Sequence, residues 1–276
     1  MKPATMKKNL QTTEKKRLTW NTRCALCLVP SLLGLMLFFI IPYLRVLYYS
    51  LINNQFKKDF VGLANYIEAI QNEYFQLAFR NSIQLIVLCV PVLLLLALLI
   101  SLGLVFLVRR KLVRVAFILP MLLPTASIVL FFRAVFGSID NVLPLYLLFI
   151  WKNIGICVIL LTAALTTIDE ELYEAARLDG AGGFFLHCRI TIPLIMPSIS
   201  FSTLLTIVNS FKIFRESYLY YGTNYPPDYG YTLQYYMNNN FLKFDYQALA
   251  SSSVLTSLLV AVIVVAGLLF ERRYQQ

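Results

Sequence analysis

The chain has 276 residues, of which 59% are hydrophobic and only 14% are charged, and its formal net charge is +10. A soluble domain typically carries about 25% charged residues, well above the fraction found here. The positive mean hydropathy of +0.69 likewise argues against a soluble protein. The basic residues do not gather on one face of a folded domain, which makes nucleic acid a poor partner. The composition therefore indicates an integral membrane protein.

The first 23 residues are polar and carry seven of the positive charges. They lead directly into an apolar run from Cys24 that is too long for the hydrophobic region of a signal peptide. We therefore expect no cleaved signal, a basic cytoplasmic tail at 1–23, and a single transmembrane domain at 24–276.

Uncharged apolar runs follow one another along the rest of the chain. A helix needs about 20 apolar residues to cross the hydrocarbon core, and these runs meet or approach that length. The predicted fold class is all-α integral membrane, with Pro120 and Pro124 bending the third span. The six expected transmembrane helices cover about 24–51, 81–108, 115–137, 142–166, 196–217 and 247–270.

The distribution of Lys and Arg predicts the orientation, because loops rich in these residues stay on the cytoplasmic side. Segments on the same side as the tail hold Arg109, Arg110, Lys111, Arg114, Arg272 and Arg273. The long opposite segments, 52–79 and 222–245, hold only Lys57, Lys58 and Lys243. Both termini are therefore expected inside, where anionic membrane lipid attracts the basic residues. The first of the outer segments also mixes acidic and apolar residues, which predicts a short helix on the outer face.

The segment 168–195, between the fourth and fifth spans, is too polar to cross a bilayer. Thr167 and Glu170 have the spacing of a capping box at the start of a helix. Gly180 supplies a break or a positive φ, and a second short helix is expected over about 183–189. The residues alone leave two interpretations open: a plain amphipathic connector, or a surface that enters a groove on another protein.

Within this segment, Glu174-Ala175-Ala176 is followed after three residues by Gly180, and after nine more by Ile190-Thr191-Ile192-Pro193. This pattern resembles the signature loop of the membrane subunits of bacterial ABC importers, although Ile192 replaces the usual Leu. The extended form EAARLDGA is similar to the carbohydrate-importer branch. Further segments that resemble this branch occur in order along nearly the whole chain: FVGLANY (60–66), ILPMLLP (118–124), WKNIG (151–155) and SFKIFRESYLYYG (210–222).

The resemblance implies a permease subunit that moves a sugar or oligosaccharide by alternating access. It implies that the signature loop forms a coupling helix, in which Glu174 engages a basic residue of a cytoplasmic ATPase and Gly180 sets the angle. The implied partners are that ATPase dimer, a second permease subunit and an extracytoplasmic solute-binding protein. No G-x-x-x-x-G-K-[ST] occurs, so ATP and Mg are expected on the ATPase and no cofactor in this chain. The implied coupling residues are Glu174, Ala175, Ala176, Asp179, Gly180, Ile190 and Pro193.

Several charges lie within or at the edges of the predicted spans, where they are costly unless they face a cavity or a partner. Lys152, in the middle of the fourth span, either lines a translocation route or pairs with a carbonyl or another subunit. Glu216 is expected to pair with Lys212, four residues before it. Because the family's fifth span lines the pore, Asn209, Phe211, Lys212, Phe214 and Arg215 are candidate pathway residues, together with Lys152 of the fourth span.

Eight tyrosines crowd the stretch from 218 to 236. Tyrosine suits sugar rings, but it equally suits the membrane interface or the docking of a binding protein, and we favour the latter pair.

Three other functions stay open: an importer for another solute such as a phosphorylated polyol, an integral-membrane enzyme, and a structural assembly factor. Against an enzyme, the single histidine, His187, lies beside Cys188 with no acidic metal-ligand cluster around it. The Cys24-x-x-Cys27 pair has redox spacing but opens an apolar helix, so all five cysteines are interpreted as packing residues.

Overall fold

The computed structural model describes residues 28–54, 56–108, 117, 119–120, 122–137 and 140–274. The regular elements in these ranges are helical, apart from one isolated β-bridge between Ile52 and Phe60. The basic tail at 1–23, the pair Cys24 and Cys27, and the turn with Arg109, Arg110, Lys111 and Arg114 lie outside the described residues.

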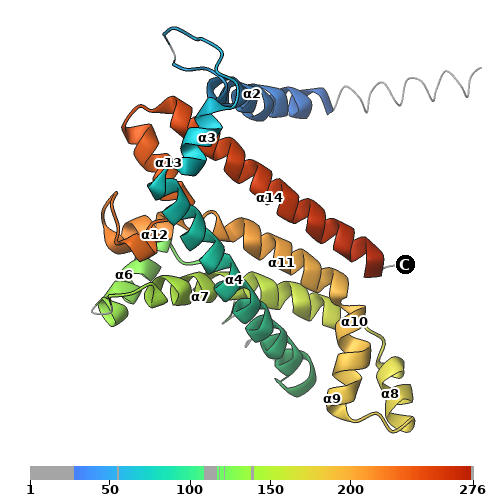
Figure 1. Ribbon diagram of the computed structural model, residues 1–276. Coiled ribbons are helices and arrows are strands. Elements are labelled where there is room, and N and C mark those ends of the chain that lie inside the picture. Colours follow the sequence, from blue (N-terminus) through green and yellow to red (C-terminus); the bar gives the residue numbers. More distant parts are fainter. Residues whose placement is uncertain are drawn as a thin grey trace, which may run out of the picture.

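The helices form a tilted bundle in which α4 crosses α7 and α11, with α14 beside α11 (Figure 1). At one end α8, α9 and α10 project from the bundle, and at the opposite end lie α3, α6, α12 and α13. The first part of the chain holds η1 (Met36–Ile40), α2 (Ile41–Ser50), α3 (Ala64–Gln71), α4 (Glu73–Leu102), η2 (Gly103–Val108), α6 (Thr125–Phe136) and α7 (Leu143–Leu165). The second part holds α8 (Glu170–Leu178), α9 (Gly183–Leu186), η3 (His187–Thr191), α10 (Ile192–Leu194), α11 (Met196–Ser210), α12 (Phe214–Tyr221), η4 (Asp228–Gly230), α13 (Leu233–Leu242) and α14 (Tyr246–Tyr274).

Among the described residues, four helices are long and apolar enough to cross a membrane, or five if one bent pair counts as a single span. The bent pair joins Gly183–Leu194 to Met196–Ser210 at an angle of 69°. The third predicted span is represented by α6, which is shorter and begins directly after Pro124. The four long helices are Leu28–Ser50, Glu73–Phe106, Leu143–Leu165 and Tyr246–Leu269.

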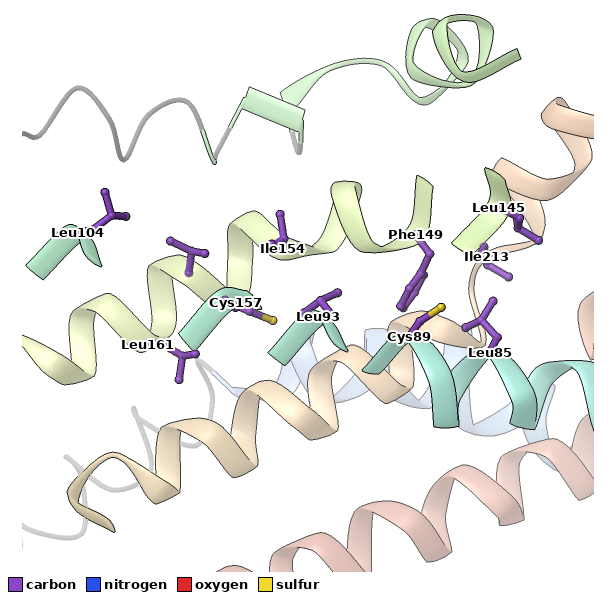
Figure 2. Close-up of a cluster of buried hydrophobic side chains, with 12 residues drawn as sticks. Leu85, Cys89, Leu93, Leu104, Leu145, Phe149, Ile154, Cys157, Leu161 and Ile213 are labelled. Atoms are coloured by element: carbon purple, nitrogen blue, oxygen red, sulfur yellow. The ribbon is translucent and has the colours of Figure 1, made fainter. Parts of the chain in front are cut away.

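The core of the bundle is the contact between α4 and α7. Figure 2 shows Cys89 and Leu93 of α4 directed toward Phe149 and Cys157 of α7. These side chains recur every four residues or so, which places them on one face of each helix. Ser101 of α4 also donates a hydrogen bond to the Val158 carbonyl, at 3.2 Å. Cys89 and Cys157 are buried packing residues as predicted, whereas Cys188 is exposed.

The predicted boundary of the second span was eight residues too late, since α4 already begins at Glu73. Asn72 caps it, because its side-chain oxygen accepts hydrogen bonds from the amides of Tyr74 and Phe75 at 3.0 and 3.2 Å. The helix therefore extends well beyond its uncharged region.

The fifth predicted span, about 196–217, is wrong as one continuous helix. α11 ends at Ser210, and α12 begins only at Phe214. The Phe214 amide donates to the side-chain oxygen of Gln234, at 3.1 Å, instead of to a carbonyl one turn earlier. The distant Gln234 side chain thus stabilises a break between two helices where local helix propensity favours one continuous helix.

The short helix predicted in 52–79 is confirmed as α3, and its place on the outer face stays a prediction. The Asn65 side chain donates to the carbonyls of Ser50 and Ile52, both at 2.9 Å, and so ties α3 to the end of α2. Later in the chain, α13 packs against the start of α4 through Tyr236 and Phe75, whose rings meet edge to face at 5.4 Å.

Our interpretation of the tyrosine-rich stretch as a surface was wrong for half of its tyrosines. Tyr220, Tyr231, Tyr235 and Tyr236 are buried, and Tyr235 is completely inaccessible. The rings of Tyr231, Tyr235 and Tyr236 pack with residues of α4 and α12, whereas Tyr220 packs against α6 and α7. We call the region formed by α3, α12 and α13 the aromatic end.

Candidate functional site

Two helices joined at a glycine form the segment 168–195, which we call the elbow. Gly180 has a φ of +84°, as expected for a turn that an L side chain resists. The Ala181 amide donates to the Ala176 carbonyl and the Gly180 amide to the Arg177 carbonyl, both at 3.0 Å. This is the Schellman pattern of a helix that ends at a glycine. The predicted helix–glycine–helix is therefore confirmed in its geometry.

The predicted capping box at the start of the elbow is wrong. The Thr167 hydroxyl donates backward to the Ala164 carbonyl, at 2.7 Å, and so completes the end of α7. Asp169 occupies the N-cap position of α8 without a side-chain capping bond. Glu170 and Glu171 do lie in the first turn, where their charge complements the positive end of the helix dipole.

The elbow is fixed to the bundle by a polar and aromatic cluster that the sequence analysis missed. Tyr173 is the one buried residue of α8, and its ring meets Phe106 edge to face at 5.5 Å. The Thr191 hydroxyl lies 3.2 Å from the Tyr173 hydroxyl and 3.1 Å from Nδ1 of His187. The His187 ring also contacts Phe106, at 5.1 Å. His187 thus packs within this cluster, and the available signal for the anchor was Tyr173, the one aromatic side chain of α8.

Leu186 and Ile195 of the elbow are buried, but several other large apolar side chains are exposed. Leu178 is 89% exposed and Phe184 is 86% exposed. Ala176, Asp179, Gly180 and Ile190, four of the implied coupling residues, border one open cavity of about 510 Å³. Glu174 and Ala175 lie exposed on α8, while Pro193 lies in α10 beside the bend into α11 and does not line this cavity.

A second, larger cavity of about 810 Å³ lies within the bundle, between α7, α11, α12 and α14. Its walls are mostly apolar, with a polar band. Lys152, Asn209 and Lys212, three of the candidate pathway residues, belong to that band. Phe211 and Phe214 pack instead against the buried tyrosines, and Arg215 does not line the cavity. Asn153 and Glu216 complete the polar band, and the sequence analysis had named neither as a pathway residue.

Glu216 forms an ion pair with Lys152, and the predicted pairing with Lys212 is wrong. Lys212 lies in the turn before α12, so it does not share a continuous helix face with Glu216. Lys152 also donates to the Thr125 hydroxyl, at 3.1 Å. The pair joins α7 to α12. Glu216 of this chain thus neutralises the charge of Lys152, which lies in an apolar helix. A hydrogen bond of 3.2 Å from Asn209 to Asn153 joins α11 to α7 on the same wall.

Metal chemistry finds no support in the ranges that the structure describes, where no group of three or more His, Cys, Asp or Glu residues could hold an ion.

Residues 86–276 match the family model described as the inner membrane component of binding-protein-dependent transport systems. The chain belongs to this family. It is therefore a multi-pass membrane subunit of a transport system that works with a binding protein, which agrees with the several apolar helices of the bundle.

Curated relatives within this family include permeases named for sugar transport. The arabinooligosaccharides transport system permease protein AraP of Bacillus subtilis is 28% identical over 269 residues, covering 85% of this chain and 83% of AraP. The lactose transport system permease protein LacF of Rhizobium radiobacter is 27% identical over 269 residues, covering 86% and 90%.

A solved structure shares the fold. It is the crystal structure of a bacterial ABC transporter involved in the import of the acidic polysaccharide alginate, with a TM-score of 0.75 and 20% identity over 96% of this chain and 100% of that chain. The chain thus has the permease fold of ABC importers.

Proposed function

We propose that the chain is the permease subunit of an ATP-driven importer that carries a sugar or oligosaccharide inward by alternating access. The substrate class is supported by AraP and LacF, which are named for arabinooligosaccharides and lactose. The solute-binding protein delivers the substrate, and a second permease subunit, a paralogue of this chain, encloses the route.

The exposed elbow is the observation that carries this proposal. Uncovered apolar side chains on a segment too polar for the membrane mark a protein interface, and Leu178 and Phe184 are such side chains. We assign the covering partner as a cytoplasmic ATPase dimer, which binds ATP and Mg. Glu174 meets a basic residue of the ATPase, and Ala175 and Ala176 permit its close approach.

The rest of the elbow converts ATPase closure into movement of the bundle. Asp179, Gly180 and Ile190 border the cavity at the turn, while Pro193 adjoins the 69° bend into α11. Rigid movement at such a bend transmits force to the helices that surround the larger cavity.

We place six spans in the membrane, with α6 as the third and α11 as the fifth beside the four long helices. The elbow then faces the cytoplasm within a single domain, 24–276, and both termini, including the tail at 1–23, lie inside. The aromatic end faces outward.

The translocation route is proposed to pass the cavity of about 810 Å³. Its polar band favours Lys152, Asn209 and Lys212 as pathway residues over Phe211, Phe214 and Arg215. A sparse polar band on apolar walls suits a route that must orient hydroxyl-bearing solutes without holding them tightly.

Co-purification and uptake together test the proposal. A tagged chain is expected to bring down an ATPase, and Glu174→Lys is expected to leave membrane insertion intact, loosen the ATPase and stop sugar uptake. Glu68→Lys is the matched control, since Glu68 is also exposed on a short surface helix, α3, at the other end.

Each alternative function predicts a different result in the same assay. A membrane enzyme brings down no ATPase, and an assembly factor leaves uptake insensitive to Glu174→Lys. Uptake of a phosphorylated polyol with no uptake of any saccharide would retain the permease but refute the sugar assignment.

A further inference from the structure

A third cavity, of about 290 Å³, lies at the end of the bundle opposite the elbow. It is lined by residues from the end of α6, by Gly137 and Asp140, and by residues at the end of α12 and in the segment after it; Figure 1 shows α6 and α12 together far from α8 and α9. It shares no residue with the larger cavity in the bundle. The lining residues are Arg133, Gly137, Asp140, Tyr220, Tyr221, Pro227 and Tyr229.

The cavity presents hydrogen-bonding groups that remain available. The Tyr229 hydroxyl donates to Oδ1 of Asp140, at 2.6 Å, which leaves lone pairs of the carboxylate free to accept. Arg133 is exposed and forms no ion pair within the part of the chain that the structure describes. The Tyr221 hydroxyl is buried without a hydrogen-bond partner among the described residues. One cation and one carboxylate therefore line a single small space, while the Tyr221 hydroxyl itself is buried in its wall.

The aromatic walls of the cavity are held in a defined shape. Tyr220 and Tyr221 meet at 5.2 Å with an angle of 89°, and Tyr221 and Tyr229 meet at 6.3 Å with an angle of 65°. A Cβ at Gly230 would lie 2.6 Å from the Tyr221 ring, so only glycine lets the chain approach this closely. Gly222, with a φ of +70°, turns the chain back at the end of α12. A preformed pocket of this kind limits the ordering cost of binding a ligand.

We propose that this cavity is a binding site for one neutral sugar unit, separate from the route through the bundle. The proposal rests on the sugar importer proposed above and adds a site at its outer end. Arg133 and Asp140 offer donors and acceptors to ring hydroxyls, and their charges balance, which favours a neutral unit over an acidic one. Tyrosine rings provide flat apolar faces for the C–H face of a sugar. The volume is at the lower end of ligand pockets, which fits a single ring and not an oligosaccharide.

Protection of an engineered thiol tests the site independently of transport. Pro227→Cys places the thiol on the cavity wall, in a full-length chain whose five native cysteines are replaced, assembled with its ATPase and second permease subunit in proteoliposomes. An impermeant maleimide labels it from outside, without the binding protein, in the presence of arabino-oligosaccharides, malto-oligosaccharides or lactose. We expect at least one of these sugars to slow labelling severalfold. Tyr225→Cys is the control, because Tyr225 is exposed on the same segment but does not line the cavity.

Arg133→Gln and Asp140→Asn should each abolish protection of Pro227→Cys while the labelling rate without sugar is unchanged. Equal labelling with and without every sugar, in proteoliposomes that import one of them, would overturn the site and leave the proposed function standing. Protection only by a uronate-containing oligosaccharide would overturn the neutral assignment. Protection only by the sugar-free binding protein would make the cavity a protein-docking surface and overturn the proposal.

Discussion

The aromatic end and the elbow are both polar connections between apolar helices, yet they relate to the rest of the chain in opposite ways. At the aromatic end, Tyr235 is completely buried and its ring meets Phe214 edge to face at 4.9 Å. At the elbow, Leu178 and Phe184 are almost fully exposed, and Tyr173 is the sole buried residue of α8. The first region is covered by this chain, whereas large apolar side chains of the second are exposed.

This difference separates stability from coupling. Burial of aromatic rings at the aromatic end contributes to the free energy of unfolding of the chain, because that surface leaves water or lipid when the chain folds. The elbow has few contacts of its own, so it belongs to the regions of low local stability from which moving parts are drawn. Substitutions in the two regions should therefore change different measurements.

The largest effect on stability is expected from Tyr235→Ala. Removing a completely buried aromatic ring costs about 3–5 kcal/mol of unfolding free energy. Thermal unfolding followed by dye labelling of the buried Cys89 and Cys157 would report the loss. Tyr225→Ala, at a 66% exposed position, should leave the midpoint unchanged.

Phe184→Ala is the matching change at the elbow. It should leave the unfolding midpoint unchanged but lower the amount of ATPase retained during purification, because Phe184 is 86% exposed. A fall in the midpoint as large as that of Tyr235→Ala would contradict the contrast between the two regions.

The next effect concerns the ion pair on the wall of the larger cavity. Glu216→Gln or Lys152→Gln should each cost about 1.5–3 kcal/mol of unfolding free energy, because a charge-assisted hydrogen bond is lost and its partner is left poorly solvated. The double exchange Lys152→Glu with Glu216→Lys should recover part of that loss. Lys212→Gln should have little effect on the unfolding free energy. A loss as large as that of Lys152→Gln would instead indicate that Glu216 pairs with Lys212, against the structure.

A smaller stability effect with a large effect on function is expected at the turn of the elbow. Gly180→Val adds about 1–2 kcal/mol of local strain, because a branched side chain resists a φ of +84°. Insertion should persist, while ATPase binding weakens and uptake stops. Gly183→Val is the control: its φ is not positive, a Cβ there meets nothing within 4 Å, and it does not line the cavity at the turn. Normal uptake in the Gly180 variant would refute the coupling role.

The smallest expected effect is a change in alkaline stability. Burial raises the pKa of Tyr231, at the aromatic end, from 10.0 to about 12. Between these values the unfolded chain releases the phenolic proton while the folded chain retains it, so stability contributed by this group falls as pH rises through that window. Tyr231→Phe should reduce the slope of the unfolding midpoint against pH between about 10 and 12.

Features that depend on neighbours in the sequence were predictable. Long apolar runs predicted α4, α7 and α14, because crossing the hydrocarbon core demands length and hydropathy alone. The turn at Gly180 was predictable because a residue without a side chain readily adopts the positive φ that ends a helix. The short helix α3 and the limits of the elbow followed for similar local reasons.

Features that depend on distant partners required the tertiary structure. The break after Ser210 depends on Gln234, 20 residues beyond Phe214, and Glu216 pairs with a lysine 64 residues before it. The capping box predicted at Thr167 was wrong because a hydroxyl between two helices can bond to either one. Here it donates to a carbonyl at the end of α7 and does not cap α8. The burial of Tyr235 could not be predicted from the sequence, because composition does not show which helices cover a side chain. Hydropathy and backbone preference act within a few residues, whereas hydrogen bonds, ion pairs and burial are decided only when separate helices meet.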